Sequence, residues 1–502
     1  MSNIRRQSII SSVIVYFGFA LGFFNTWLFA REGGFSQTQY GLTGVFIAIA
    51  NVIFAFSNLG MQAYIYKFFP YYNDNLPPAK NDMISFALAT SCLGFLIMLL
   101  SGLIFKDFVI RKYGTNSPDL IKYYYWVFPF GFGLTIYSLL EAFAWQLKKS
   151  VVTNFLREVQ FRALTTILIV LSLTGVIKNF DLFIKLFAFT YITIACILLT
   201  YLLSTGQIHF TWSLSRVTKK FFKKIVALAA FVWGGGLVYS IANVFDTILI
   251  AAVLENGLAF AAIYTLAQNM ASLIQAPQRA IISSSIGPLS QAWKNKDYTR
   301  LNQIYQRSSI NQLLFSVGMF VLIWINFTDG VFTFNLQENY LSARYVFLFI
   351  GLMRIIDMGT GVNSQIIATS TYWRFEFFTG IILLSLTIPL NYILTKSLGV
   401  PGTAISNLIA FSIYNTIRYI FLLRKFNMQP FNIKTLYTIL LGISCYFICH
   451  YLFSQYQGFL WMILRSSIFV MLYISGVVFL KISPDLVPVW KTVTKKVRGI
   501  KR

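Results

Sequence analysis

The chain has 502 residues, of which 57% are hydrophobic and only 11% charged, and its mean hydropathy is +0.66. Soluble domains carry about 25% charged residues, so this composition excludes a soluble multidomain protein. Lys and Arg outnumber Asp and Glu by 41 to 16, a net charge of +25. Most of these positive charges lie in the connections between apolar runs, which argues against a nucleic-acid partner. The sequence predicts an all-α polytopic membrane protein.

Cutting the sequence at its polar interruptions leaves about fourteen apolar runs, most near the roughly 20 residues that a helix needs to cross hydrocarbon. We predict that each run is a transmembrane helix. Trp and Tyr gather at the ends of runs, as in KYYYWVF (Lys122–Phe128), which is typical of a membrane interface. The runs cover residues 7–30, 40–66, 83–106, 120–145, 160–178, 182–204, 225–253, 257–285, 308–328, 341–367, 376–396, 402–424, 434–453 and 459–481.

The distribution of positive charge predicts the topology. Short loops rich in Lys and Arg stay in the cytoplasm, and here they occupy alternate connections, so we predict that both termini are cytoplasmic. The first run follows MSNIRRQ but is too long for a signal peptide and lacks a cleavage site, which predicts an uncleaved first span. One connection disagrees with this topology, because Lys106, Arg111, Lys112 and Lys122 fall on the predicted outer side.

One long basic connection, TGQIHFTWSLSRVTKKFFKK (Thr205–Lys224), separates six runs from the next six. We therefore predict an N-terminal six-helix lobe at 1–204, a basic cytoplasmic linker at 205–224 and a C-terminal six-helix lobe at 225–425. Residues 426–502 are predicted to form helices 13 and 14 and a basic cytoplasmic tail that touches anionic lipid headgroups. Transporters commonly have two such halves and handle their substrate between them.

The sequence lacks the patterns of common enzyme sites. No G-x-x-x-x-G-K-[ST] phosphate loop occurs, and His209 and His450 have no neighbouring carboxylate cluster that would suggest metal or acid–base chemistry. The predicted outer loops are also short, whereas membrane enzymes that polymerise or ligate saccharides usually need a sizeable one. We therefore predict that the protein is not an enzyme and has no catalytic residues, cofactor or metal site.

Several ionisable residues fall inside the apolar runs, where a charge costs about 2.5–3.5 kcal/mol on insertion scales. Such residues usually face a bundle interior or a wet cavity, so they are functional candidates. Arg354 and Asp357 lie near mid-depth in GLMRIIDMGTG (Gly351–Gly361), three residues apart on one helix face and able to pair. The full set is Glu141, Arg162, Lys185, Asp246, Arg279, Arg354, Asp357, Arg418 and Arg465.

Four segments carry a resemblance to a known family. They are YKFFPYYNDN (Tyr66–Asn75), TNFLREVQFRALTTILIVL (Thr153–Leu171), AIYTLAQNMASLIQAPQRAI (Ala262–Ile281) and LGVPGTAISNLIA (Leu398–Ala410). In their order and spacing they resemble the Wzx-type oligosaccharide flippases, particularly those of Bacteroidetes lipopolysaccharide (O-antigen) or capsule biosynthesis. The resemblance extends over nearly the whole chain. It implies the MATE-like fold of the multidrug, oligosaccharidyl-lipid and polysaccharide exporter superfamily, with two six-helix lobes around a central cavity.

The resemblance also implies a function. A flippase of this kind moves undecaprenyl-diphosphate-linked oligosaccharide from the inner to the outer leaflet of the bacterial cytoplasmic membrane by alternating access. Its implied partners are this lipid-linked substrate, membrane lipids, a polysaccharide polymerase and glycosyltransferases. The alternative is a cation-coupled multidrug antiporter of the same superfamily, which would favour a cavity lined by carboxylates.

Arginine suits a diphosphate because its planar guanidinium binds two oxygens at once and stays charged in apolar surroundings. We predict that Arg279 and Arg354 contact the diphosphate and that Asp357 orients Arg354. In the other interpretation, Arg354 and Asp357 only neutralise each other inside their lobe. Asp246 and Glu141 are candidates for carrying a coupling proton, although Asp246 could simply form hydrogen bonds within its lobe.

Overall fold

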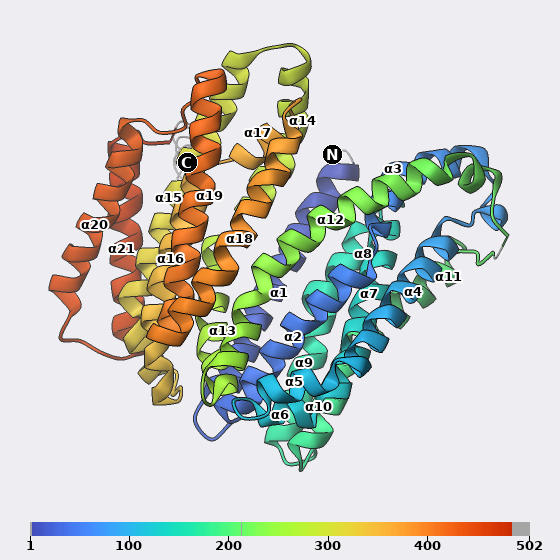
Figure 1. Ribbon diagram of the computed structural model, residues 1–502. Helices are drawn as coiled ribbons and strands as arrows, with labels where there is room; N and C mark the ends of the chain where they lie inside the picture. The colour runs from blue at the N-terminus through green and yellow to red at the C-terminus, as the bar shows by residue number, and fades with distance from the viewer. Residues whose placement is uncertain (1–2, 212, 484–502) are drawn as a thin grey trace, which may run out of the picture. The chain divides into compact units, whose positions relative to one another are not determined.

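The computed structural model describes residues 3–211 and 213–483, which form α-helices joined by short turns and loops. The chain divides into two compact units, one up to Thr265 and one from Leu266 onward. Figure 1 traces the helices of both units along the chain. The predicted basic tail begins beyond residue 483 and lies outside the described residues.

The first unit is built around a core of buried side chains from α3, α4, α7, α11 and α12. Short 3-10 turns, η1 and η2, cover Pro78–Lys80 and Tyr124–Trp126. The helices are α1 (Asn3–Ala30), α2 (Gln37–Ser57), α3 (Met61–Asn75), α4 (Met83–Ile104), α5 (Lys106–Tyr113), α6 (Pro118–Lys122), α7 (Val127–Gln146), α8 (Ser150–Asn154), the π-helical segment η3 (Phe155–Gln160), α9 (Phe161–Leu173), α10 (Phe180–Ala188), α11 (Thr190–Ser204) and α12 (Arg216–Val253).

Local sequence signals explain where α2 begins and ends. Its N-terminus is a capping box, in which the Gln39 backbone N–H donates to Ser36 Oγ and the Ser36 N–H donates to Gln39 Oε1. After α2, Gly60 has a φ of +73°, a left-handed conformation that glycine adopts at little cost. A Cβ at Gly60 would lie 2.2 Å from the carbonyl oxygen of Ala229 in α12. Glycine therefore allows both the break between α2 and α3 and the close approach of α12.

The end of the predicted linker is held in place by a buried carboxylate. Asp82, directly before α4, accepts hydrogen bonds from the Ser215 backbone N–H at 2.9 Å and from Thr218 Oγ1 at 2.6 Å. Residues Arg216–Lys224 of that linker belong to α12, which packs on α2 and α3 within the first unit. The division into lobes at 1–204 and 225–425 stays a prediction.

In the second unit, α15 packs against α16, α20 and α21, and α19 packs against α16 and α18. Helix α13 (Gly257–Ile274) begins in the first unit and ends in the second. The remaining elements are α14 (Gln278–Lys294), α15 (Tyr298–Thr333), the 3-10 turn η4 (Glu338–Ser342), α16 (Ala343–Gly359), α17 (Asn363–Ala368), α18 (Trp373–Leu398), α19 (Val400–Phe426), α20 (Ile433–Phe453) and α21 (Phe459–Phe479).

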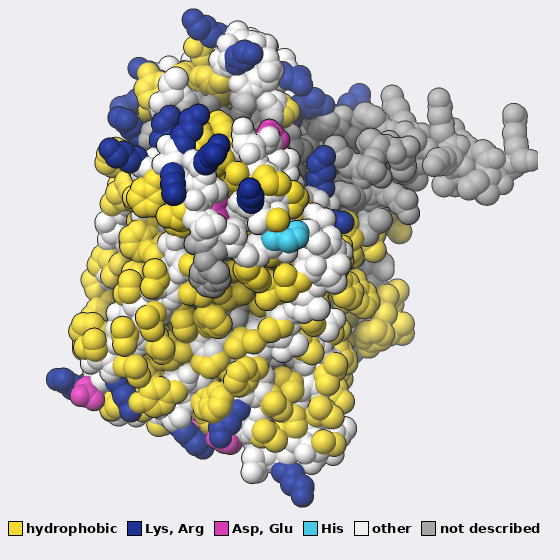
Figure 2. Space-filling model, turned by 90° about the vertical axis from the view of Figure 1, so that its right-hand side faces the viewer, with side chains coloured by type: hydrophobic (Ala, Val, Ile, Leu, Met, Phe, Trp, Pro, Cys, Tyr) yellow, Lys and Arg dark blue, Asp and Glu magenta, His cyan; other side chains and the backbone are white. Residues whose placement is uncertain are grey.

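The described helices have the length and composition of a multi-pass membrane protein. Eleven of them are long and apolar enough to cross a membrane, and each overlaps one of the predicted apolar runs. The other three predicted runs, 160–178, 341–367 and 402–424, contain α9, α16 with α17, and α19. Figure 2 shows one face with a broad band of hydrophobic side chains and with Lys and Arg gathered beyond one edge of that band. The predicted all-α polytopic fold is confirmed.

Candidate functional site

A network of polar side chains surrounds Asp357 in the second unit. One carboxylate oxygen, Oδ2, accepts a hydrogen bond from Gln278 Nε2 of α14 at 3.0 Å, and the other accepts one from Asn415 Nδ2 of α19 at 3.1 Å. Asn415 Oδ1 in turn accepts hydrogen bonds from Thr360 Oγ1 at 3.1 Å and Asn363 Nδ2 at 3.2 Å. We call these residues the Asp357 network, and it joins α14, α16, α17 and α19.

The break between α16 and α17 positions two members of this network. Gly361 has a φ of +64°, and a Cβ there would lie 2.8 Å from Ser308 Oγ of α15. The same Ser308 hydroxyl accepts a hydrogen bond from the Val362 backbone N–H at 3.3 Å. Because α15 holds the break in this way, Thr360 before it and Asn363 after it both reach Asn415.

A partly buried ion pair lies next to the Asp357 network. Arg418 of α19 pairs with Glu376 of α18, and its guanidinium lies over the Tyr414 ring, 3.6 Å from the centroid. Glu376 Oε1 also accepts a hydrogen bond from Ser364 Oγ at 2.6 Å. Arg418 is only 4% exposed, so within the described structure it is a member of a buried polar cluster.

Arg354 lies one helical turn before Asp357 and is half-buried. Among the described residues it has no ion-pair or hydrogen-bond partner, and its Nε atom is buried without one. Within the described structure Arg354 and Asp357 form no ion pair, and the two carboxylate oxygens of Asp357 accept hydrogen bonds from Gln278 and Asn415 instead. Arg354 therefore makes no direct ion pair, in the described part of the chain, with the carboxylate three residues away.

Arg279 follows Gln278 in the first turn of α14 and is exposed. Because Gln278 is hydrogen-bonded to Asp357, the start of α14 lies beside the part of α16 that carries Arg354. The structure thus brings the segments of Arg279, Arg354 and Asp357 together in one region of the second unit. Their contact with a diphosphate stays a prediction.

The first unit contains a different set of charges. Glu141 of α7, a predicted coupling residue, is buried and forms an ion pair with Arg157 at 2.9 Å. Arg157 comes from the π-helical segment η3, and such segments are frequent at functional sites. Its neighbour Glu158 pairs with Arg162 at 2.9 Å. Any role of Glu141 in coupling stays a prediction, and it would involve a carboxylate that already has a cationic partner.

Two glycines in α1 make room for Arg162, a contact that sequence reasoning missed. A Cβ at Gly18 would lie 2.9 Å from Arg162 Nη1, and a Cβ at Gly22 would lie 3.0 Å from Arg162 Nε. The Arg162 guanidinium also lies 5.4 Å from the centroid of the Phe19 ring. The spacing of Gly18 and Gly22 on one helix face is the available sequence signal, because glycines at this spacing allow close packing in membranes.

Asp246, the other predicted coupling residue, is 4% exposed in α12. Its carboxylate accepts a hydrogen bond from the Tyr264 hydroxyl of α13 at 2.6 Å. The hydrogen bonding that the sequence suggested for Asp246 therefore has a specific partner in the first unit. A role in coupling stays a prediction.

Comparison with known proteins identifies the family. The model described as "polysaccharide biosynthesis protein" matches residues 4–293, more than half of the chain. The chain belongs to this family. No curated protein matches the chain in sequence.

The fold of this polysaccharide biosynthesis protein is similar to those of several other proteins whose structures have been solved. The lipid II flippase MurJ in an inward closed conformation has a TM-score of 0.75 at 17% identity, with 95% of this chain and 100% of that chain covered. An inward-facing MATE-family multidrug transporter of the MOP superfamily has a TM-score of 0.62 at 15% identity, covering 83% of this chain and 94% of that chain. A MATE structure in the straight conformation has a TM-score of 0.55 at 14% identity, covering 84% and 96%.

Family and fold together confirm the predicted resemblance to Wzx-type flippases and their exporter superfamily. The polysaccharide biosynthesis protein is an integral membrane protein with the fold seen in MurJ and in MATE transporters.

Proposed function

We propose that this protein moves an undecaprenyl-diphosphate-linked oligosaccharide from the inner to the outer leaflet of the bacterial cytoplasmic membrane, for surface polysaccharide biosynthesis. The family description and the MurJ-like fold support this function. The proposed mechanism is alternating access between the lobes 1–204 and 225–425. The protein would receive its substrate from glycosyltransferases and deliver it to a polysaccharide polymerase.

The observation that carries this proposal is the uncompensated guanidinium of Arg354. A diphosphate that crosses hydrocarbon needs cationic partners, and arginine binds two of its oxygens in a fixed geometry. In the described structure, Asp357 is engaged by two amides and leaves Arg354 without a counter-ion. A bound diphosphate would supply that counter-ion, and the exposed Arg279 on the adjoining segment would add a second positive charge.

The alternative is a cation-coupled multidrug antiporter. The likeness to MATE transporters and the presence of buried carboxylates are both compatible with it. An antiporter of this kind needs carboxylates that can release a proton or bind a cation. Here Glu141 is paired with Arg157, and both oxygens of Asp357 accept amide hydrogen bonds. These engagements favour the flippase.

Deletion of the gene separates the two functions. For a flippase, lipid-linked saccharide should accumulate at the inner leaflet and a surface polysaccharide should disappear. Complementation with the natural chain should restore the polysaccharide, while Arg354→Gln should not. Arg424→Gln is the matched control, because Arg424 is an exposed arginine in the last turn of α19. Unchanged surface glycans together with greater sensitivity to cationic dyes would instead establish the antiporter.

The proposed orientation has both termini in the cytoplasm, and reporter fusions test it. A reporter active only outside the membrane should work near Asn256 and fail near Lys220. A fusion near Thr115 tests the connection whose Lys and Arg content disagrees with the rest. The opposite results at Asn256 and Lys220 would reverse the topology.

A further inference from the structure

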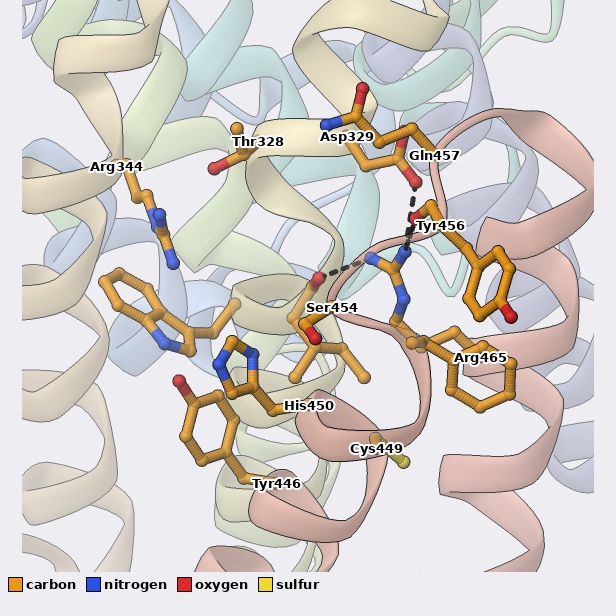
Figure 3. A pocket seen from close by; sticks show the side chains of 13 residues that line it. Thr328, Asp329, Arg344, Tyr446, Cys449, His450, Ser454, Tyr456, Gln457 and Arg465 are labelled. Atoms are coloured by element: carbon orange, nitrogen blue, oxygen red, sulfur yellow. Dashed lines mark hydrogen bonds and ion pairs between the residues drawn. The ribbon is translucent and has the colours of Figure 1, made fainter.

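A pocket of about 200 Å³ lies in the second unit among α15, α16, α20, α21 and the turn between the last two helices. It shares no residue with the Asp357 network. Figure 3 shows Arg344 and His450 extending from different helices toward the same space, with Arg465 and Asp329 on another side of it. The pocket is lined by polar and aromatic side chains that the proposed transport site does not use.

One wall of this pocket is held by an ion pair whose two members also bond to the backbone. The Arg465 guanidinium pairs with Asp329 at 3.2 Å and donates to the carbonyl oxygens of Ile325 at 2.8 Å and Tyr456 at 2.9 Å. Asp329 Oδ1 also accepts a hydrogen bond from the Gly458 backbone N–H at 2.9 Å. Because Arg465 and Asp329 neutralise each other, this wall fixes the turn between α20 and α21 and adds no net charge.

The opposite wall carries an uncompensated charge. The Arg344 guanidinium lies over the Trp324 ring, 4.5 Å from the centroid, and Arg344 has no ion-pair or hydrogen-bond partner among the described residues. Its Nε atom and the Thr328 hydroxyl are both buried without a partner. Arg344 also lies in the first turn of α16, where the helix dipole disfavours a positive charge and no acidic residue offsets it. His450, stacked on Tyr446, adds a further hydrogen-bonding group.

We propose that this pocket binds the phosphate of a lipid headgroup, with Arg344 as the principal contact and with Thr328 and His450 as hydrogen-bonding partners. A phosphate supplies the negative charge and the acceptor oxygens that these groups lack. The volume suffices for a phosphate and part of its glycerol or sugar, since a water occupies about 30 Å³ in the liquid.

A lipid is the source of the phosphate because the surroundings are apolar and aromatic. Exposed hydrophobic side chains flank the pocket on α20 and α21, among them Tyr451, Phe459 and Leu460. Tryptophan and tyrosine rings such as those of Trp324 and Tyr446 are typical of the headgroup level of a membrane. The ligand is either an ordinary anionic phospholipid or a polyprenyl diphosphate, which share this phosphate chemistry. The site does not depend on the proposed transport of an oligosaccharide.

Binding of defined lipids to the purified full-length protein in detergent tests the site. The probes are short-chain phosphatidylglycerol, phosphatidylcholine of the same chain length, a polyprenyl diphosphate and inorganic phosphate, each followed by native mass spectrometry and by the unfolding temperature. Arg344→Gln should weaken phosphatidylglycerol binding about tenfold or more, because it removes a charge-assisted contact. Arg31→Gln is the control, since Arg31 also lies over a tryptophan ring, at 5.5 Å from Trp27, but does not line the pocket.

The outcomes are distinct. Preference for phosphatidylglycerol, or a preference for the polyprenyl diphosphate that Arg344→Gln abolishes and Arg354→Gln leaves intact, identifies which lipid occupies the site and supports the proposal. Equal binding of phosphatidylcholine, equal competition by inorganic phosphate, or undiminished binding by Arg344→Gln overturns it. If Arg344→Gln does not fold, His450→Gln decides by the same criterion. Arg354→Gln should bind phosphatidylglycerol normally, which separates a failure of this site from a failure of the proposed transport function.

Discussion

Arg465 and Arg354 lie in the same unit, and each is an arginine inside a predicted apolar run. In the part of the chain that the structure describes they differ in their partners, although the Nε atom of each is buried without one. Arg465 is 7% exposed and donates to a carboxylate and to two backbone carbonyls. Arg354 is half-buried and has no ion-pair or hydrogen-bond partner among the described residues.

This difference separates an arginine that holds helices together from one that is available to a ligand. A buried charge that keeps its partners contributes to the architecture, and removing it strands the partner. An arginine without partners contributes little to the architecture, so an external anion is the reason for its presence that fits the proposed function. The predictions below test this contrast, beginning with the structural arginine.

Arg465→Met should give the largest loss of stability, about 3–5 kcal/mol, because it leaves Asp329 buried without its cationic partner. Thermal unfolding of the purified protein and its abundance in membranes measure the effect. The double variant Arg465→Met with Asp329→Leu should lose less than the sum of the two single changes, because no orphan charge remains. If the loss of stability of the double variant equals the sum of the two single losses, the two residues do not act as a pair.

Arg354→Gln should leave the unfolding temperature nearly unchanged and reduce transport about ten- to hundredfold, because hydrogen bonds to charged groups contribute about 1.5–3 kcal/mol. Complementation of surface polysaccharide in the deletion strain measures transport. Arg354→Lys should recover only part of it, since an ammonium lacks the planar guanidinium. A stable Arg354→Gln protein with normal surface polysaccharide would remove Arg354 from the substrate site.

The sequence predicted the helical architecture because hydrophobic composition and the roughly 20-residue span length leave few alternatives for such a chain. It also identified the ionisable residues inside the runs. It could not predict their partners. The i, i+3 spacing suggested that Asp357 pairs with Arg354, whereas Gln278 and Asn415 compete successfully from positions 79 and 58 residues away.

The same reason explains the missed contacts of the first unit. Glu141 and Arg157 are 16 residues apart on different helices, and the π-helical segment that carries Arg157 leaves no simple periodicity in the sequence. Side-chain pairing across helices depends on helix rotation and depth, which hydrophobic patterns specify only coarsely. The candidate site residues could therefore be proposed from their residue type, while their state of pairing required the structure.

Asp357→Asn should destabilise the second unit by about 1–3 kcal/mol, because one of the two amide donors loses its acceptor and becomes a buried unsatisfied group. Asp107→Asn is the control, since Asp107 is an exposed carboxylate of α5. Unfolding in denaturant or by heat compares the two variants. Equal stability of both would contradict the role of Asp357 as the centre of its network.

Thr360→Val and Thr387→Val compare a hydroxyl that has a hydrogen-bond partner with one that has none among the described residues, and their expected effect on stability is the smallest. Both threonines are buried in the second unit, at 5% and 0% exposure. The Thr360 hydroxyl lies within hydrogen-bonding distance of two acceptors, the Asp357 carbonyl oxygen at 2.8 Å and Asn415 Oδ1 at 3.1 Å, whereas Thr387 Oγ1 is buried with no partner in the described structure.

Valine has nearly the shape of threonine without the hydroxyl, so each substitution changes mainly the hydrogen bonding. Thr360→Val should lower the free energy of unfolding by about 0.5–1.5 kcal/mol, the net contribution of an ordinary hydrogen bond. Thr387→Val should be neutral or stabilising, because it removes a buried polar group that the described structure leaves unsatisfied. Thermal unfolding of both variants under identical conditions measures the difference. The free energy of unfolding could instead fall as much for Thr387→Val as for Thr360→Val. The hydrogen-bond partners seen in the structure would then not distinguish polar groups that stabilise the fold from polar groups that are free to bind a ligand. The inference drawn from Arg354 would lose its basis.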